Sequence, residues 1–263
     1  MAGLYLWLTG PLRRRHGWAP RFPWRRAALY FGGLALMFVT LNGPVHDLSD
    51  DYLFSVHMVQ HLLLTEVWAP LFILGLPAWL VALIVRPPAL RRLAHALSNP
   101  VVAGLVFSAS IGLWHAIPFY DAMMRNHSIH IFAHITFMVA AVIAWWPVCC
   151  PIPEGGRLSE PMQMLYLFVL GIPMMIVAAL ITLSNQVLYP WYSTAPRVWG
   201  LTPLMDQQLG GLIMWVPGGL ALWIAITVIW FSWNGREARR REAEERAEDE
   251  AAGLTAPNPA TTG

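Results

Sequence analysis

Six stretches of the chain are apolar over the length that a membrane-spanning helix requires, because a bilayer core about 30 Å thick needs roughly twenty helical residues. The predicted spans are Ala27–Leu41 with an extension to Val45, Val56–Val85, Pro100–Trp114, Ile129–Val148, Met162–Leu188 and Leu209–Trp233. The second contains Pro70 and Pro77, which predict a kinked or strongly tilted helix. We therefore expect an all-α fold, a polytopic membrane bundle of six transmembrane helices.

Composition supports this class. The chain is 57% hydrophobic and 12% charged, with a mean hydropathy of +0.50, which is too apolar for a soluble globular domain. Fourteen tryptophans and twenty-one prolines fit aromatic interfaces and kinked helices. The lipid bilayer is the expected surrounding. The formal net charge of +2 gives no indication of a nucleic-acid partner.

The arginines predict the orientation of the bundle. They gather before the first predicted span, between the second and third, and after the sixth. The intervening loops, such as "HDLSDD" and "YDAMMRNHS", are acidic or nearly free of charge. Because Lys and Arg accumulate on the cytoplasmic side, we expect both termini in the cytoplasm of a bacterium, with the protein in its inner (plasma) membrane.

The same pattern divides the chain into three parts. Residues 1–26 form a basic cytoplasmic segment that does not fit a signal peptide, because its apolar stretch is short and its charges follow that stretch. Residues 27–233 are the transmembrane helical domain. Residues 234–263 are a charged cytoplasmic tail, in which alternating Arg and Glu predict a solvated helix and the last residues, "TAPNPATTG", are expected to be disordered.

Histidines concentrate at the predicted outer ends of three spans. His57 and His61 open the second span, His115 closes the third, and His130 and His134 open the fourth. Each of the two i,i+4 pairs projects from one helix face, so two facing pairs would form a nitrogen site suited to copper, zinc or iron.

Several other residues lie near this layer. Asp206, at the start of the sixth span, is either a further ligand or second-shell acceptor, or a cap of its own helix. His46 and His127 are read as ordinary loop residues. Soft thioether donors near the same side are Met58, Met123, Met124, Met205 and Met214.

Three blocks of sequence, "HMVQHLLL…PLFILGLP", "WHAIPFYDAM…HIFAHITF…AWWP" and "PLMDQQLGGLIMWVPGG", resemble the signature blocks of the CtaG family. The resemblance runs from about Tyr30 to Trp233 and implies a membrane factor for assembly of haem–copper cytochrome c oxidases. Members usually begin with an additional helix, of which "GLYLWLTGPLRRR" resembles the cytoplasmic end. Members often carry Glu where this chain has Ala133, so His134 needs another partner here.

Three functions are compatible with these features. The first is an assembly factor that is not an enzyme, binds copper through His57, His61, His115, His130, His134 and Asp206, and interacts with oxidase subunits or other assembly factors. The second is a haem-binding electron-transfer or haem-handling protein with His61 and His134 as axial ligands. The third is a zinc-dependent membrane hydrolase with Glu66 as base. Copper is the expected metal, with haem and zinc as alternatives.

Overall fold

The computed structural model describes residues 1–152 and 155–255, with side chains described up to residue 250, and every regular element in those ranges is helical. The expected disorder of the last residues concerns positions outside this range. The elements are α1 Ala2–Trp7, η1 Leu8–Leu12, α2 Arg13–His16, α3 Trp24–Thr40, α4 Pro44–Asp51, α5 Phe54–Leu62, η2 Leu63–Trp68, α6 Ala69–Gly75, α7 Ala78–Ile84, α8 Pro88–Leu97, α9 Pro100–His115, α10 Ile117–Arg125, α11 His127–Cys149, α12 Glu160–Thr182, α13 Pro190–Thr194 and α14 Pro203–Thr255.

The predicted all-α membrane bundle is confirmed, with between four and six spans in the described part of the chain. Four continuous helices are long and apolar enough to cross a bilayer: Phe54–Gly75, α11, α12 and α14. Two bent pairs also reach the required length. The pair α3 and α4 bends by 48°, and the pair α8 and α9 bends by 70°.

The structure moves three of the predicted span boundaries. The second span is continuous only to Gly75, because the chain turns extended at Leu76 before Pro77 and restarts as α7. Pro70 is accommodated within it directly after the π-helical turn η2, where a missing N–H is tolerated. Helix α12 ends at Thr182 instead of Leu188. Helix α14 begins at Pro203 and continues without a break into the predicted tail, as far as Thr255.

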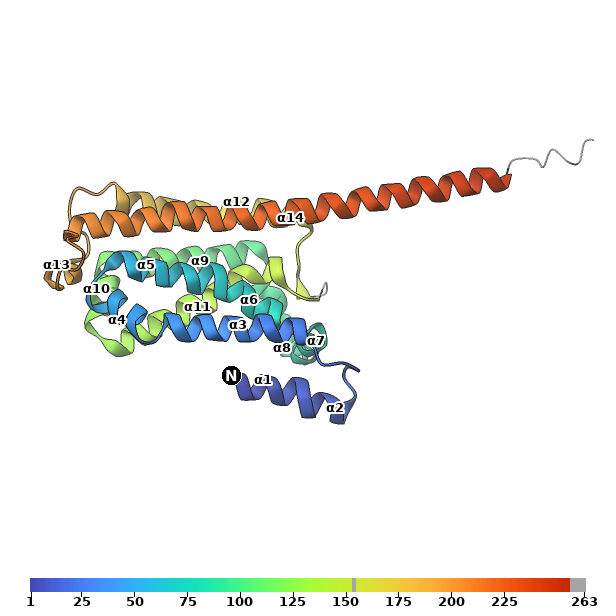
Figure 1. Cartoon of the computed structure of the whole chain (residues 1–263), viewed down its shortest axis with the longest axis horizontal. Helices are drawn as coiled ribbons and strands as arrows, with labels where there is room; N and C mark the ends of the chain where they lie inside the picture. Colours follow the sequence, from blue (N-terminus) through green and yellow to red (C-terminus); the bar gives the residue numbers. More distant parts are fainter. Residues whose placement is uncertain (153–154, 256–263) are drawn as a thin grey trace, which may run out of the picture.

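The helices form layers, which Figure 1 shows in side view. Helices α12 and α14 pack along each other, and α14 also contacts α5. Beneath them α9 packs against α11, and α3 packs against α6. The side chains that point away from the bundle are apolar, including Leu105, Phe132, Leu180 and Phe231, each more than half exposed. Such an apolar exterior is what a lipid-facing surface requires.

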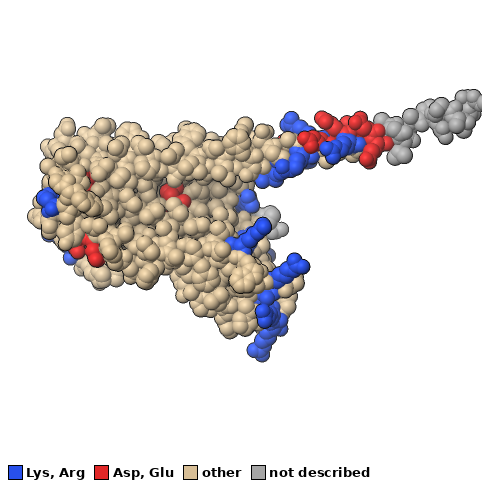
Figure 2. Space-filling model, viewed as in Figure 1, with Lys and Arg blue, Asp and Glu red and all other residues tan. Residues whose placement is uncertain are grey.

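The two ends of the bundle differ in charge. The end that carries α2 and α8, which we call the arginine end, holds basic side chains including Arg14, Arg15, Arg91 and Arg92. Figure 2 shows basic residues concentrated at this end and along the projecting part of α14. The opposite end, where α4, α10 and α13 lie, is called the histidine end (Figure 1). The charge asymmetry matches the asymmetry of the loops in the sequence.

Close packing joins the first helical segment to the bundle. The Tyr5 ring stacks on Tyr30 with ring centroids 4.1 Å apart, and the Tyr5 hydroxyl donates to the Gly75 carbonyl at 2.9 Å. Arg26 donates to the carbonyls of Leu74 and Leu76. The last carbonyls of α6, which lack partners within their own helix, are thereby satisfied. Gly75 is required there because a Cβ would lie 2.7 Å from the Tyr30 backbone nitrogen.

Candidate metal centre

Three helices bring acidic and imidazole side chains together at the histidine end. Helix α4 begins at Pro44, after Gly43 in a left-handed conformation with φ 66°. Helix α11 begins after Asn126, whose side chain accepts hydrogen bonds from the Ser128 and Ile129 amides. That cap fixes the start of α11 and thereby the face from which His130 and His134 project.

Asp50, His57 and His130 form the core of the cluster. One ligand atom from each lies within 4.8 Å of the other two. The Asp50 carboxylate is 3.3 Å from His130 Nδ1 and 3.8 Å from His57 Nδ1. These three groups come from α4, α5 and α11, so folding alone assembles the set. A carboxylate with two imidazoles is a ligand set that zinc and divalent copper both accept.

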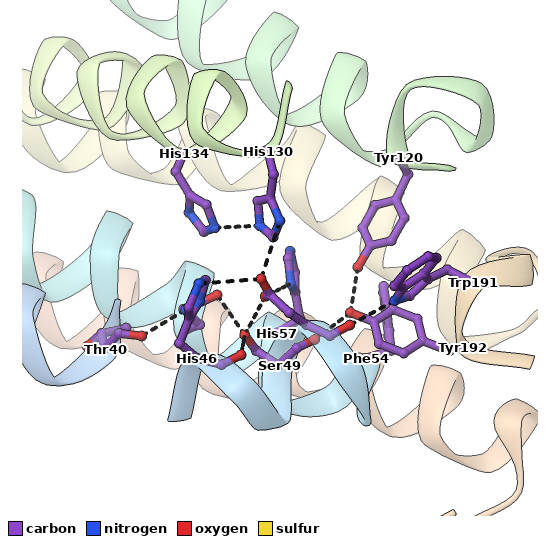
Figure 3. A network of polar contacts seen from close by, with 12 residues as sticks. Thr40, His46, Ser49, Phe54, His57, Tyr120, His130, His134, Trp191 and Tyr192 are labelled. Carbon is purple, nitrogen blue, oxygen red and sulfur yellow. Dashed lines mark hydrogen bonds and ion pairs between the residues drawn. The ribbon is translucent and has the colours of Figure 1, made fainter. Parts of the chain in front are cut away.

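Two further histidines border this core. His46 Nε2 lies 3.5 Å from the same Asp50 carboxylate. His134 Nε2 lies 2.8 Å from His130 Nε2. Figure 3 shows His130 and His134 pointing from α11 toward His46 and His57 on the facing helices. The expected convergence of the two i,i+4 pairs is therefore present in the geometry.

His61 and His115 lie one layer deeper in the bundle. The His61 ring centroid is 4.3 Å from that of His57 and 5.6 Å from that of His134. The His115 ring centroid is 6.0 Å from that of His61. All five histidines named from the sequence are thus part of one connected group, with His61 as the link between its outer and deeper members.

The cluster is buried, yet several imidazole nitrogens have no hydrogen-bond partner. His57 is fully buried, and His61 and His115 are each 7% exposed. Partners are absent for both nitrogens of His57, for His61 Nδ1, for His115 Nε2 and for His134 Nδ1. Buried polar atoms are normally satisfied, so such a concentration of free nitrogen atoms needs an explanation. Coordination of a metal ion supplies one.

Hydrogen bonds hold α4 in place over the cluster. Gln60 donates to the Thr40 carbonyl at 2.8 Å, and its side-chain oxygen accepts from Ser49 at 3.1 Å. From α13, Trp191 donates to the Asp50 carbonyl at 2.8 Å, and Tyr192 donates to the Ser49 carbonyl at 2.6 Å. Figure 3 shows this chain of contacts running from Thr40 to Tyr192. The position of Asp50 therefore depends on residues distant in sequence.

The tyrosines of this network act as neutral donors. Tyr120 donates to the Tyr192 hydroxyl at 3.2 Å. Burial raises the pKa of both phenols well above the ordinary value. Both groups therefore remain protonated at physiological pH, and Tyr192 keeps the proton with which it binds the Ser49 carbonyl.

Asp206 has a different position from the histidines. Its two carboxylate oxygens accept from the Phe54 amide at 2.7 Å, the Ser55 amide at 3.1 Å and the Ser55 hydroxyl at 2.5 Å. The residue therefore caps the first turn of α5, the helix that carries His57 and His61, instead of its own helix. In this arrangement the carboxylate positions α5 and, with it, the candidate ligands His57 and His61.

Asp50 and His46 were not among the residues selected from the sequence. They are spaced i,i+4 in "PVHDLSDD", the spacing that identified the other pairs, and they lie in the same outer layer. This i,i+4 spacing could therefore have identified both residues from the sequence. Asp50 also places a carboxylate 3.3 Å from His130 Nδ1. His127, read as a loop residue, is exposed at the first position of α11.

Comparison with known proteins gives a family and three relatives from mycobacteria. A family model described as "cytochrome c oxidase caa3 assembly factor" (Caa3_CtaG) matches residues 3–236. Uncharacterized proteins of Mycobacterium bovis and Mycobacterium tuberculosis are each 28% identical over 253 residues, covering 90% of this chain and 38% of their own length. An uncharacterized protein of Mycobacterium leprae is 27% identical over 241 residues, covering 86% of this chain and 36% of its own length.

The chain thus spans less than two fifths of the length of these curated relatives. No solved structure matches the chain significantly.

Proposed function

Because this chain belongs to the family of cytochrome c oxidase caa3 assembly factors, we propose that it serves oxidase assembly by binding copper at the histidine end of its bundle. Copper is the cargo in this proposal, and a nascent oxidase subunit or another assembly factor receives it. The observation that carries the proposal is the convergence of Asp50, His57 and His130 within 4.8 Å, among buried imidazoles that have unpartnered nitrogens.

The geometry supports a site that releases its metal. Asp50 is 20% exposed and His46 is 30% exposed, whereas His57 on the inner side is fully buried. A site with one accessible side can exchange its ion with a partner, unlike a closed structural cage. Both partly exposed groups are on α4, which Trp191 and Tyr192 hold in place through hydrogen bonds to its carbonyls.

The proposed orientation follows from the charge of the two ends. The arginine end faces the cytoplasm according to the positive-inside rule, with six spans and both chain termini on that side of a bacterial plasma membrane. The metal centre then lies at the outer face. This is the side on which an ion can be taken up without crossing the hydrocarbon core.

The ring spacing favours an ion over a macrocycle. Ring centroids within the cluster are 4.3 to 6.4 Å apart. A site for a cofactor-sized ligand needs about 300 Å³ or more, and rings this close together do not enclose such a volume. Zinc remains the alternative metal, since the Asp and His ligands suit it equally. In the proposed role the protein is not an enzyme.

Metal analysis of the detergent-purified protein tests the proposal. The double variant Asp50→Asn with His130→Gln removes two ligands while nearly preserving side-chain size. Its matched control, Asp47→Asn with His127→Gln, changes the same residue types on the same two helices at exposed positions. We expect the control to retain copper. Affinity in the double variant should fall by at least about 100-fold, because loss of a supporting partner alone costs about 10–100-fold.

Oxidase activity in cells at limiting copper provides the functional measurement. The double variant should lower it, and added copper should partly restore it, because mass action compensates for weakened binding. Full oxidase activity at limiting copper in the double variant would rule out copper transfer at this site. Purified protein that carries zinc and takes up no copper would rule out copper as the metal.

A further inference from the structure

A small cavity lies next to the outer cluster, at the level of His61. It has a volume of about 20 Å³, enough for one water-sized body, since a single water needs about 10–15 Å³. His61 and His115 line one part of its wall. Residues of α5, η2, α9, α11, α12 and α14 line it, so the cavity is built by the packing of segments that are distant in sequence.

Three methionines complete the polarizable part of the wall. They are Met58 on α5, Met174 on α12 and Met214 on α14. Each is almost completely buried, with 1%, 3% and 4% of its surface exposed. Of these, Met58 and Met214 were considered from the sequence, whereas Met174 is 40 residues from Met214 and reaches the cavity only through the fold. Met123 and Met124 are buried elsewhere on α10, and Met205 is exposed.

The histidines present free nitrogen atoms at this depth. His115 Nδ1 lies 2.8 Å from the Ile111 carbonyl and therefore carries the proton that it donates. The other ring nitrogen, Nε2, is then unprotonated, and it is buried without a partner. His61 Nδ1 is likewise buried without a hydrogen-bond partner. A hydrogen bond that fixes the tautomer of a metal-ligating imidazole is a regular feature of metal sites.

We propose that this cavity is a second metal site, specific for a monovalent soft ion such as Cu(I), with imidazole nitrogen from His61 and His115 and thioether sulfur from Met58, Met174 and Met214. Thioethers are neutral soft ligands that select Cu(I) over divalent ions. A neutral ligand set also suits a buried site better for one positive charge than for two, because the cost of burying charge rises with its magnitude.

The two sites differ in ligand chemistry and share a boundary. The outer set holds the Asp50 carboxylate and suits a divalent ion, whereas the deeper set has no carboxylate among its lining residues. His57 and His61, one helical turn apart, connect them. The inference deepens the proposed function and takes the identity of the metal from it, while the cavity itself is an independent observation.

Binding of Cu(I), and of Ag(I) as a redox-inert substitute, to the anaerobic detergent-purified full chain tests the inference. Affinity is measured by competition with a chromophoric Cu(I) chelator, and X-ray absorption of the bound copper reports sulfur neighbours. The triple variant Met58→Leu, Met174→Leu and Met214→Leu keeps side-chain volume. Its matched control is Met123→Leu, Met124→Leu and Met205→Leu. A second variant, His115→Phe, removes a nitrogen donor without touching sulfur.

We expect the triple variant to lower Cu(I) and Ag(I) affinity by at least about tenfold and to remove sulfur scattering. The control variant should keep the Cu(I) and Ag(I) affinity of the parent. Cu(II) binding at the outer site should be unchanged in both methionine variants. Unchanged Cu(I) affinity in both the triple variant and His115→Phe overturns the second site and leaves the proposed function intact. Loss of both Cu(I) and Cu(II) on Asp50→Asn with His130→Gln alone overturns it as well, because all copper would then occupy one centre. If Asp50→Asn with His130→Gln leaves all copper binding unchanged while the triple variant loses sulfur-ligated Cu(I), the second site is supported and the outer site is refuted.

Discussion

Replacement of Asp206 by Ala separates a positioning role from direct metal ligation. In the folded protein the carboxylate is fully buried and accepts from the Phe54 and Ser55 amides and from the Ser55 hydroxyl. The variant leaves two backbone N–H groups at the start of α5 without an acceptor. A buried unsatisfied donor costs about 1–3 kcal/mol, and the hydroxyl can rotate to another partner. We therefore expect a loss of about 2–6 kcal/mol in the free energy of unfolding.

Unfolding in mixed micelles, followed by tryptophan fluorescence in the presence of a metal chelator, measures this loss without a contribution from bound metal. The variant Ser55→Ala is the graded control, because it removes one donor and leaves both amides capped; its expected cost is about 1–3 kcal/mol. Metal affinity of Asp206→Ala should also fall, because the first turn of α5 positions His57. If the chelated variant is as stable as the parent but binds less metal, the capping role is wrong and Asp206 is a ligand.

Two other predictions concern packing and orientation. Gly75→Ala should destabilise the protein by about 1–3 kcal/mol in the same unfolding assay, because the new Cβ would lie 2.7 Å from the Tyr30 backbone nitrogen; Gly112→Ala, with open space around its position, should instead stabilise by about 0.5–1 kcal/mol. An equal effect of the two substitutions would contradict the close approach of α3 and α6. A reporter fused after Gly235 should read as cytoplasmic, and a periplasmic signal would reverse the proposed orientation and place the metal centre on the inner side.

Hydropathy was sufficient to predict the helical membrane fold, since lipid permits few alternatives to apolar helices. The ends of the helices were harder to predict because they depend on local capping. The start of α14 carried a readable signal in "TPLMD": Thr202 accepts from the Met205 amide at 3.2 Å, and Pro203 occupies the first helical position. The break after Gly75 had a local signal in Pro77, whereas the close approach of Tyr30 to Gly75 is a contact that no local pattern reveals.

In the candidate site, too, some features follow from local sequence and others depend on contacts between distant segments. The i,i+4 spacing places His57 with His61 and His130 with His134 on single helix faces, so these pairs could be inferred locally. The place of Asp50 in the cluster depends on α4, and α4 is held by Tyr192 and Trp191, about 140 residues away. Capping of α5 by Asp206 is also a contact between distant segments. Sequence periodicity contains no information about such contacts.

Helix α14 joins the two sides of the protein in one piece. It has 53 residues, and its closest approach to the bundle is at Gly210, where a Cβ would overlap the ring of Phe54 on the first turn of α5. About 10 Å of helix precedes this point and about 68 Å follows it, at 1.5 Å per residue. For a rigid helix that pivots at this contact, the two arms are in a ratio of about 1:6. A partner that shifts the far end by about 6 Å therefore moves the Asp206 end by about 1 Å, a change large enough to weaken the hydrogen bonds that seat the first turn of α5.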